Sequence, residues 1–257
     1  MTKIIQITDP HLGPDANFQL AGVNTRNSFS AVVREACKQS PDLLLITGDI
    51  AAEPNTAAYE HFFDVIQETG LPYAWLPGNH DTIELVESVD HSTPYRKTYD
   101  IGNWRIFLLD SVLPDTPNGA FGEEELRQFK QLLAENTQEH AMVCVHHHPI
   151  PVGSNWLDRQ CIADAEDFIQ IVHGDNRVKN IHWGHIHQAF EKTLDGVLYA
   201  SAPSTCIQFK PESEQFALDD ELPGYRVINL SSDGSVQTEV TRVAVSGYNV
   251  LLGTQGY

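Results

Sequence analysis

Basic residues are scarce in this chain of 257 residues, which has 16 lysines and arginines against 35 aspartates and glutamates. The net charge of −19 at pH 7 gives a surface that repels polyanions and anionic membranes. We therefore expect no nucleic-acid partner and no membrane partner. An anionic ligand would have to be attracted locally, by metal ions or by a few cationic side chains.

Long apolar runs and paired cysteines are also missing. No segment approaches the roughly 20 apolar residues that a membrane-spanning helix needs, and the first residues lack the layout of a signal peptide. The four cysteines (Cys37, Cys144, Cys161 and Cys206) are scattered without CxxC spacing. We therefore expect four reduced thiols and a cytoplasmic protein.

Hydrophobic periodicity predicts alternating strands and helices, followed by hairpins. Residues 42–49 form a continuous apolar run closed by Gly48, which is typical of a strand buried on both faces. Other strands are predicted at residues 3–8, 73–76, 104–109, 141–145 and 180–183, and helices at residues 24–39, 55–67, 123–135 and 164–173. Hairpins are predicted over residues 190–200 and 225–243, where Asp-Gly pairs mark the turns.

This order of elements predicts an α/β (α+β) fold, a four-layer αββα sandwich of two mixed β-sheets flanked by helices. A chain that is 41% hydrophobic can bury one large core. We expect a single domain over residues 1–246 and an extended C-terminal tail over residues 247–257.

Five short clusters of polar residues follow the predicted strands. They are Asp9 and His11; Asp49 after Gly48; Gly78, Asn79, His80 and Asp81; His146, His147, His148 and Pro149; and Gly184, His185 and His187. The carboxyl ends of strands in layered sheets gather at one rim, so these clusters are expected to converge. Carboxylate, amide and imidazole groups without thiolates predict a site for two divalent metals, and such a site suits hydrolysis of a phosphate ester.

Spacing within the clusters supports this interpretation. Asp9 and His11 are two residues apart, as are His185 and His187, and residues at this spacing point the same way in an extended segment. The glycine before Asp49 allows the backbone to turn its carboxylate toward the pocket, where it could bridge two cations. Each pair alone is also compatible with an ordinary turn.

Other residues suggest separate roles within the site. Asn79 offers a neutral oxygen, and His80 beside it could donate a proton to a leaving alkoxide if it is not itself a ligand. The three histidines His146, His147 and His148 cannot all face one site, because neighbours in a strand alternate. One ligand and two supporting residues is the division we expect.

The order and spacing of these clusters resemble the calcineurin-like metallophosphoesterases. Further similarity, over nearly the full chain, is to the bacterial class III 3′,5′-cyclic-AMP phosphodiesterases. It is carried by residues 6–9, 22–25, 58–62, 75–81, 146–149, 156–158, 184–188, 203–206 and 208–211, and by the closing residues 256–257. Pro10 stands where that family would have threonine, but it is not a ligand position.

The resemblance implies a ligand set and a fold, a double β-sandwich flanked by helices. The first metal would be held by Asp9, His11 and His187, the second by Asn79, His147 and His185, and Asp49 would bridge both. His147 is preferred over its neighbours because the family has a His-x-Pro pattern. Two divalent ions per subunit are implied, Fe²⁺ or Mn²⁺ first, with Zn²⁺ or Co²⁺ as alternatives.

The implied reaction is hydrolysis of 3′,5′-cyclic AMP to 5′-AMP, which lowers cellular cyclic AMP. A hydroxide shared by the two metals would attack in line, and the catalytic residues would be His80, which acts on the leaving oxygen, and Asn79. The expected substrate contacts are His11, Asn79, His80 and His187. Asn24, Trp156, Phe209 and Lys210 are further candidates, and Arg26 could also line the mouth.

The ligand set leaves other functions open. The same chemistry could act on glycerophosphodiesters, 2′,3′-cyclic nucleotides or other small phosphodiesters. A non-catalytic scaffold would be expected to lack ligands or His80, and every expected position is filled. Metal storage would not need a non-ligand histidine beside Asn79. The protein is expected to be a monomer or a small homo-oligomer.

Overall fold

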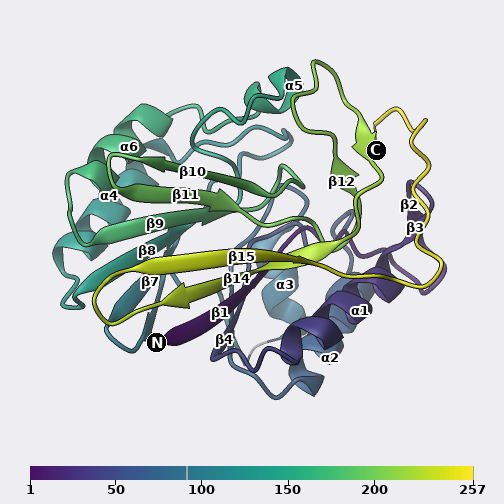
Figure 1. The fold of residues 1–257 in the computed structure, drawn as a ribbon, viewed down its shortest axis with the longest axis horizontal. Helices are drawn as coiled ribbons and strands as arrows, with labels where there is room; N and C mark the ends of the chain where they lie inside the picture. Colours follow the sequence, from purple (N-terminus) through teal and green to yellow (C-terminus); the bar gives the residue numbers. More distant parts are fainter. Residues whose placement is uncertain (91, 257) are drawn as a thin grey trace.

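The computed structural model of the protein describes residues 1–90 and 92–256, and two mixed β-sheets form its centre (Figure 1). The first sheet has the order β15-β14-β1-β4-β5, in which β1, β4 and β5 are parallel, β14 is antiparallel to β1, and β15 is antiparallel to β14. Its strands are β1 (Thr2–Ile7), β4 (Leu43–Ile46), β5 (Tyr73–Trp75), β14 (Gly224–Leu230) and β15 (Val236–Arg242).

The second sheet has six strands in the order β10-β11-β9-β8-β7-β6. Its four central strands are parallel, and an antiparallel strand closes each edge. Its strands are β6 (Thr98–Ile101), β7 (Trp104–Leu108), β8 (His140–Cys144), β9 (Val178–Trp183), β10 (Phe190–Leu194) and β11 (Val197–Ser201).

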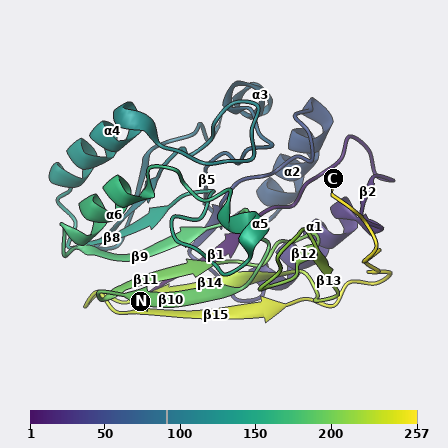
Figure 2. The same ribbon diagram turned by 90° about the horizontal axis from the view of Figure 1, so that it is seen from above.

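Helices cover the outer face of each sheet. In Figure 1, α1 (Thr25–Cys37) and α2 (Thr56–Glu68) lie on one side of the sheets, and α4 (Gly122–Ala134) and α6 (Ala165–His173) lie on the other. Figure 2 shows α4 and α6 next to each other over the six-stranded sheet. The remaining elements are α3 (Ile83–Val89), α5 (Asn155–Asp158) and two short strand pairs, β2 (Gln19–Leu20) with β3 (Val23–Asn24) and β12 (Gln208–Phe209) with β13 (Leu218–Asp219).

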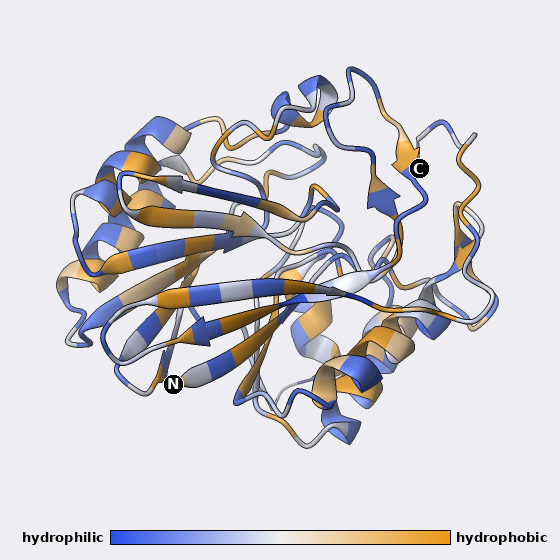
Figure 3. Cartoon of the chain, in the orientation of Figure 1, coloured by the Kyte–Doolittle hydropathy of each residue, from blue (hydrophilic) through white to orange (hydrophobic). Residues whose placement is uncertain are grey.

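The two-residue alternation of the strands divides the interior into three apolar layers. In β4, Leu43 and Leu45 pack between the two sheets, whereas Leu44 and Ile46 pack against α1 and α2. In β8 of the other sheet, Met142 and Cys144 pack between the sheets, whereas Ala141 and Val143 pack in the layer that contains residues of α4 and α6. Figure 3 shows hydrophobic and hydrophilic residues interleaved along α4 and α6, and the buried ones face the sheet. This arrangement confirms the predicted αββα sandwich.

The predicted strands and long helices are present, with ends within a few residues of the predicted positions. The sequence did not predict α3, α5, β6 or the two short strand pairs. Residues 247–256 carry no helix or strand, and Tyr257, the last residue of the predicted tail, lies outside the described residues. Among the described helices, none is both long and apolar enough to cross a membrane.

Candidate metal centre

The five polar clusters occupy the loops that follow β1, β4, β5, β8 and β9, and backbone hydrogen bonds join these loops. The amide of Asp9 donates to the Gly48 carbonyl at 3.0 Å, and the amide of Gly184 donates to the His146 carbonyl at 3.1 Å. The two sheets are joined where the His185 amide donates to both carboxylate oxygens of Asp9, at 3.1 and 3.0 Å. The clusters therefore converge on one rim, as the sequence indicates.

One group of potential ligand atoms comes from Asp9, His11 and His187, and these atoms all lie within 4.8 Å of one another. Nε2 of His11 lies 3.1 Å from Nε2 of His187, which lies 3.4 Å from Oδ1 of Asp9. Nδ1 of His187 lies 2.9 Å from the Ile207 carbonyl, which can only accept, so Nδ1 is the donor of this hydrogen bond. The Nε2 atom of His187 is therefore the one that can bind a metal.

A second group contains His147 and His185, together with His146. Nδ1 of His147 lies 2.8 Å from the Ser111 hydroxyl, and its buried Nε2 has no hydrogen-bond partner among the described residues. The Asn79 amide oxygen is close by, 3.2 Å from Nε2 of His146. This is the set predicted for the second metal, with His146 in addition.

The Asp49 carboxylate lies between the two groups. Its Oδ2 atom is 3.6 Å from Nε2 of His11 and 3.3 Å from Nε2 of His146. Burial alone would raise the pKa of Asp49, but the nearby imidazoles of His146, His80 and His11 hold it well below its usual range. An ionised carboxylate between the two groups has the position that a bridging ligand requires.

The chemistry of these donors fits divalent metal ions. Burial holds the pKa of His11, His147 and His185 well below the usual histidine value, and neutral imidazole is the form that binds metals. A buried imidazole nitrogen without a partner, as in His147, is costly unless something binds it. Oxygen and nitrogen donors without a thiolate match Fe, Mn, Zn and Co ions.

Backbone strain is concentrated at these positions. Among the described residues, ten other than glycine have positive φ angles, and half of them are predicted metal ligands. These five are Asp9 (51°), His11 (44°), Asp49 (51°), His185 (62°) and His187 (47°). Left-handed backbone costs about 1–3 kcal/mol in a residue other than glycine, and such residues cluster at functional sites. Strained backbone is therefore an independent feature that five of the seven predicted ligands share.

Two glycines allow the loops to approach closely. A Cβ atom on Gly78 would lie 2.2 Å from Oδ1 of Asp49, and one on Gly184 would lie 2.2 Å from the Thr8 hydroxyl. Only a residue without a side chain fits at either position. The glycines of the predicted clusters thus permit the packing that brings the acidic and imidazole groups together.

Three further histidines of the clusters, His146, His148 and His80, contact the predicted ligands. His148 faces Asp158 at 3.8 Å, and its ring stacks on that of His185. His146 contacts both Asp49 and Asn79, so geometry alone does not separate it from His147 as a ligand. His80 is half-buried, with its amide donating to Oδ1 of Asp49 at 2.9 Å and its Nδ1 2.7 Å from the Ala52 carbonyl.

A pocket of about 240 Å³ opens beside the metal ligands and contains an aromatic wall. Trp156 and Phe209, both predicted substrate contacts, line it, together with Phe216 and Gln160, which the sequence did not single out. The Phe209 ring stacks on His187, with centroids 4.2 Å apart and planes 9° apart. Asp49, Asn79, His80 and His185 also line this pocket, so the wall adjoins the predicted ligands.

Three other candidates, Asn24, Lys210 and Arg26, do not line this pocket. The Asn24 side chain caps α1 by accepting the Asn27 amide at 2.9 Å and donating to the Ala16 carbonyl. Lys210 is exposed, and neither residue lines the pocket beside the metal ligands. The guanidinium of Arg26 donates to the carbonyls of Gly13 and Ala57, which ties it to neighbouring loops. The structure therefore gives Asn24 and Arg26 local structural contacts.

Asp81, the last residue of its cluster, holds two ligand loops in place. Its buried carboxylate accepts the amides of Gly78 at 3.0 Å, Ile50 at 3.0 Å and Ala51 at 3.2 Å. The Tyr59 hydroxyl also lies 3.2 Å from the same carboxylate. These contacts connect the loop that carries Asp49 to the loop that carries Asn79.

We predict that Asp81→Asn weakens metal binding about 10- to 100-fold, the usual effect of losing a group that orients ligands. The new amide NH₂ would face backbone N–H donors and loosen both loops. Elemental analysis after dialysis against buffered metal measures the effect. Tyr59→Phe is the matched control, because it keeps all three backbone contacts to Asp81. Unchanged metal affinity in Asp81→Asn would contradict this role.

Comparison with known proteins agrees with this geometry. The family described as calcineurin-like phosphoesterase matches residues 2–189. A relative from Escherichia coli K12, named 3′,5′-cyclic adenosine monophosphate phosphodiesterase CpdA, is 36% identical over 99% of this chain and 94% of its own length. A relative from Nostoc, named a 3′,5′-cyclic-nucleotide phosphodiesterase, is 34% identical over 95% of this chain and 93% of its own length.

Solved structures share the fold at low sequence identity. A dimetal phosphatase from Danio rerio superposes with a TM-score of 0.65 at 13% identity, covering 95% of this chain and 99% of the other. A purple acid phosphatase from yellow lupin seeds gives 0.66 at 14% identity, covering 94% and 53%. The chain therefore belongs to the calcineurin-like phosphoesterase family, whose members use a dinuclear metal centre.

Proposed function

We propose that this protein is a metal-dependent phosphodiesterase that hydrolyses 3′,5′-cyclic AMP to 5′-AMP. The observation that carries the proposal is similarity over nearly the whole chain to proteins named as cyclic-AMP phosphodiesterases. The E. coli relative and a Haemophilus influenzae relative at 34% identity each match 99% of this chain. That coverage includes the metal-ligand clusters and the aromatic wall beside them.

The proposed metal ligands are those that the sequence indicated. Asp9, His11 and His187 would hold one ion, Asn79, His147 and His185 the other, and Asp49 would bridge them. When bound, two divalent ions offset phosphate charge and lower the pKa of a water toward neutrality. We propose Fe²⁺ or Mn²⁺ as the ions, with Zn²⁺ or Co²⁺ as alternatives, since all four accept this donor set.

His80 is proposed to act on the leaving 3′-oxygen of the ribose. Its Nδ1 atom lies 2.7 Å from the Ala52 carbonyl, which fixes the ring orientation and the proton on that nitrogen. The half-buried ring also lines the pocket beside the metal ligands, as a proton donor to substrate must. Because Nδ1 already carries a proton, the donor would be the imidazolium form, which has a second proton on Nε2 and would pass that proton to the leaving oxygen as the bond to phosphorus breaks.

The aromatic wall is proposed to hold the purine. Trp156 meets Phe209 and Phe216 edge to face, with ring centroids 5.0 and 5.2 Å apart. Flat rings next to a phosphate-binding centre can stack on a base without requiring a fixed hydrogen-bond pattern. The Gln160 amide, with Oε1 2.9 Å from Nε2 of His185, joins this wall to the metal ligands.

We also propose a cytoplasmic location and an assembly no larger than a small homo-oligomer. A cytoplasmic location is supported by the four cysteines, all of which are free. A monomer or a small homo-oligomer remains the expected assembly.

A substrate panel tests the proposed function. Protein saturated with one metal would be assayed with 3′,5′-cyclic AMP, 3′,5′-cyclic GMP, 2′,3′-cyclic AMP, glycerophosphocholine and bis(p-nitrophenyl) phosphate. We expect the highest kcat/KM among the natural diesters for 3′,5′-cyclic AMP, with 5′-AMP as the product. Slow turnover of cyclic AMP beside rapid turnover of another natural diester would contradict the proposed substrate.

We predict that His80→Ala lowers kcat about 10²- to 10⁴-fold while both metals stay bound, because the side chain acts on the leaving group. Steady-state kinetics and elemental analysis of the same preparation measure both effects. Asn79→Ala serves as the contrast, since it should lose the second metal together with activity. Loss of metal from His80→Ala would identify His80 as a ligand instead.

We predict that Trp156→Ala raises KM for cyclic AMP about tenfold and changes kcat little, because a stacking surface for the base is lost. The matched control substrate is a methyl riboside 3′,5′-cyclic phosphate, which keeps the reacting group and lacks the base. Its kinetic constants should stay the same in Trp156→Ala. An equal loss for both substrates would mean that Trp156 supports the fold of the site and does not bind the base.

A further inference from the structure

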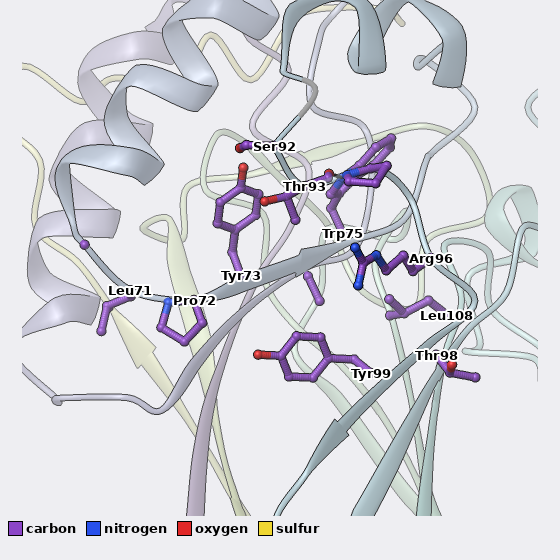
Figure 4. A pocket seen from close by; sticks show the side chains of 13 residues that line it. Leu71, Pro72, Tyr73, Trp75, Ser92, Thr93, Arg96, Thr98, Tyr99 and Leu108 are labelled. Carbon is purple, nitrogen blue, oxygen red and sulfur yellow. Dashed lines mark hydrogen bonds between the residues drawn. The ribbon is translucent and has the colours of Figure 1, made fainter.

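Two pockets of the protein differ in what lines them. The pocket in Figure 4, of about 570 Å³, is lined mainly by residues of β5, β6 and the segments that lead into them, and no predicted metal ligand is among its described lining residues. The pocket of about 240 Å³ beside the metal ligands has Asp49, Asn79 and His185 in its wall. Gln160 also lines this smaller pocket, and among the described lining residues it is the one amide that is not a predicted ligand.

The backbone around Gln160 is held against the ligand loops. Its amide donates to the Leu157 carbonyl at 2.7 Å, which closes the turn after α5. The next two residues contact the His148 carbonyl, through the Cys161 thiol at 3.1 Å and the Ile162 amide at 3.1 Å. Leu157 and Ile162 are both buried in the apolar layer beneath. The position of Gln160 is therefore fixed relative to the loop that carries His148.

The side chain of Gln160 contacts a predicted ligand through its oxygen. Oε1 lies 2.9 Å from Nε2 of His185. An amide oxygen can only accept, so the imidazole donates from Nε2 and has its lone pair on Nδ1. A neutral imidazole with its proton on one nitrogen binds a metal through the other. Gln160 thus selects Nδ1 of His185 as the metal-binding atom and orients the ring.

The amide nitrogen of Gln160 is left for a ligand of the pocket. The NH₂ group has two donors, and it has no hydrogen bond to any residue in the described part of the chain. The side chain is half-buried and lines the pocket together with Asp49 and His185. A phosphodiester held by the metals would present its non-bridging oxygens, which are acceptors, at this end of the pocket.

We propose, on the basis of the proposed function, that Gln160 has two roles in the reaction. Its oxygen positions His185 for the second metal, and its NH₂ group donates to a non-bridging oxygen of the bound phosphodiester. The amide suits both roles because one rigid group carries an acceptor and a donor. A carboxylate at this position would supply the acceptor alone, and a thioether of similar length would supply neither.

The variants Gln160→Glu and Gln160→Met test the positioning role. Gln160→Glu keeps an acceptor for His185, so its affinity for the second metal should be at least that of the natural protein. Gln160→Met loses the acceptor, so its affinity should fall about 10- to 100-fold. Titration of metal-free protein with Mn²⁺, followed by electron paramagnetic resonance, measures this without substrate. Equal affinity in Gln160→Met and the natural protein, or an equal loss in both variants, would overturn the positioning role.

Steady-state kinetics of Gln160→Glu test the contact to phosphate. A carboxylate oxygen would face the phosphate in place of the NH₂ donor, so KM for cyclic AMP should rise about tenfold or more with both metals bound. The inhibition constant of 5′-AMP should rise further, because its phosphate carries more negative charge. Gln170→Glu, which adds the same charge on the exposed face of α6, is the matched control and should leave both constants unchanged. An unchanged KM in Gln160→Glu would overturn the contact.

Two further substrates identify what Gln160 contacts. Methyl riboside 3′,5′-cyclic phosphate lacks the base, and its KM should rise in Gln160→Glu as much as that of cyclic AMP. A rise for cyclic AMP alone would place the donor on the base and overturn the contact to phosphate. Bis(p-nitrophenyl) phosphate reports on a phosphodiesterase of any natural substrate. A higher KM for it in Gln160→Glu, when the natural protein does not turn over cyclic AMP, would overturn the proposed function alone. Normal turnover of cyclic AMP with the same KM in both proteins would overturn the Gln160 contact alone.

Discussion

The hydrogen bonds from the His185 backbone amide to the Asp9 carboxylate are the contact on which the site depends. Asp9 follows β1 in one sheet and His185 follows β9 in the other, so this contact joins the two sheets at the rim where the ligands gather. The amide of Thr205 adds a second tie, at 3.0 Å from the Thr8 carbonyl. Buried hydrogen bonds to a charged acceptor are among the stronger polar contacts in proteins. These hydrogen bonds therefore help to hold the predicted ligands of the two sheets next to each other.

The strained backbone of the ligand loops follows from the same convergence. Asp9, Asp49 and His185 adopt left-handed conformations. Backbone hydrogen bonds between loops hold Asp9 and Asp49, and the His185 amide donates to the Asp9 carboxylate. Such conformations persist only where the surroundings over-determine them. Asp81 has this role for the loop of Asp49, because its carboxylate accepts amides from that loop and from the next one. A residue that is not a ligand is therefore as important for the geometry as the ligands themselves.

The sequence predicted the elements and ligands whose signals are local. A closed apolar run at residues 42–49 and helical spacing at residues 24–39 identify buried elements without tertiary information. Short elements such as β2, β6 and β12 escaped prediction because they form through tertiary pairing and carry little periodicity. The choice between His146 and His147 stays open for a related reason. Both rings are buried near His185, and a turn, unlike a strand, does not alternate its side chains strictly.

Strand β5 shows how an edge strand can support the site. Its carboxyl end leads to Asn79 and His80, so it contributes to the metal centre as every parallel strand of this rim does. β5 is the last strand of the five-stranded sheet, so within the described residues no strand pairs with its outer edge. The rings of Tyr73 and Trp75 are buried in the apolar layer that also contains Phe63 of α2. This packing holds in place the edge strand that leads into Asn79 and His80.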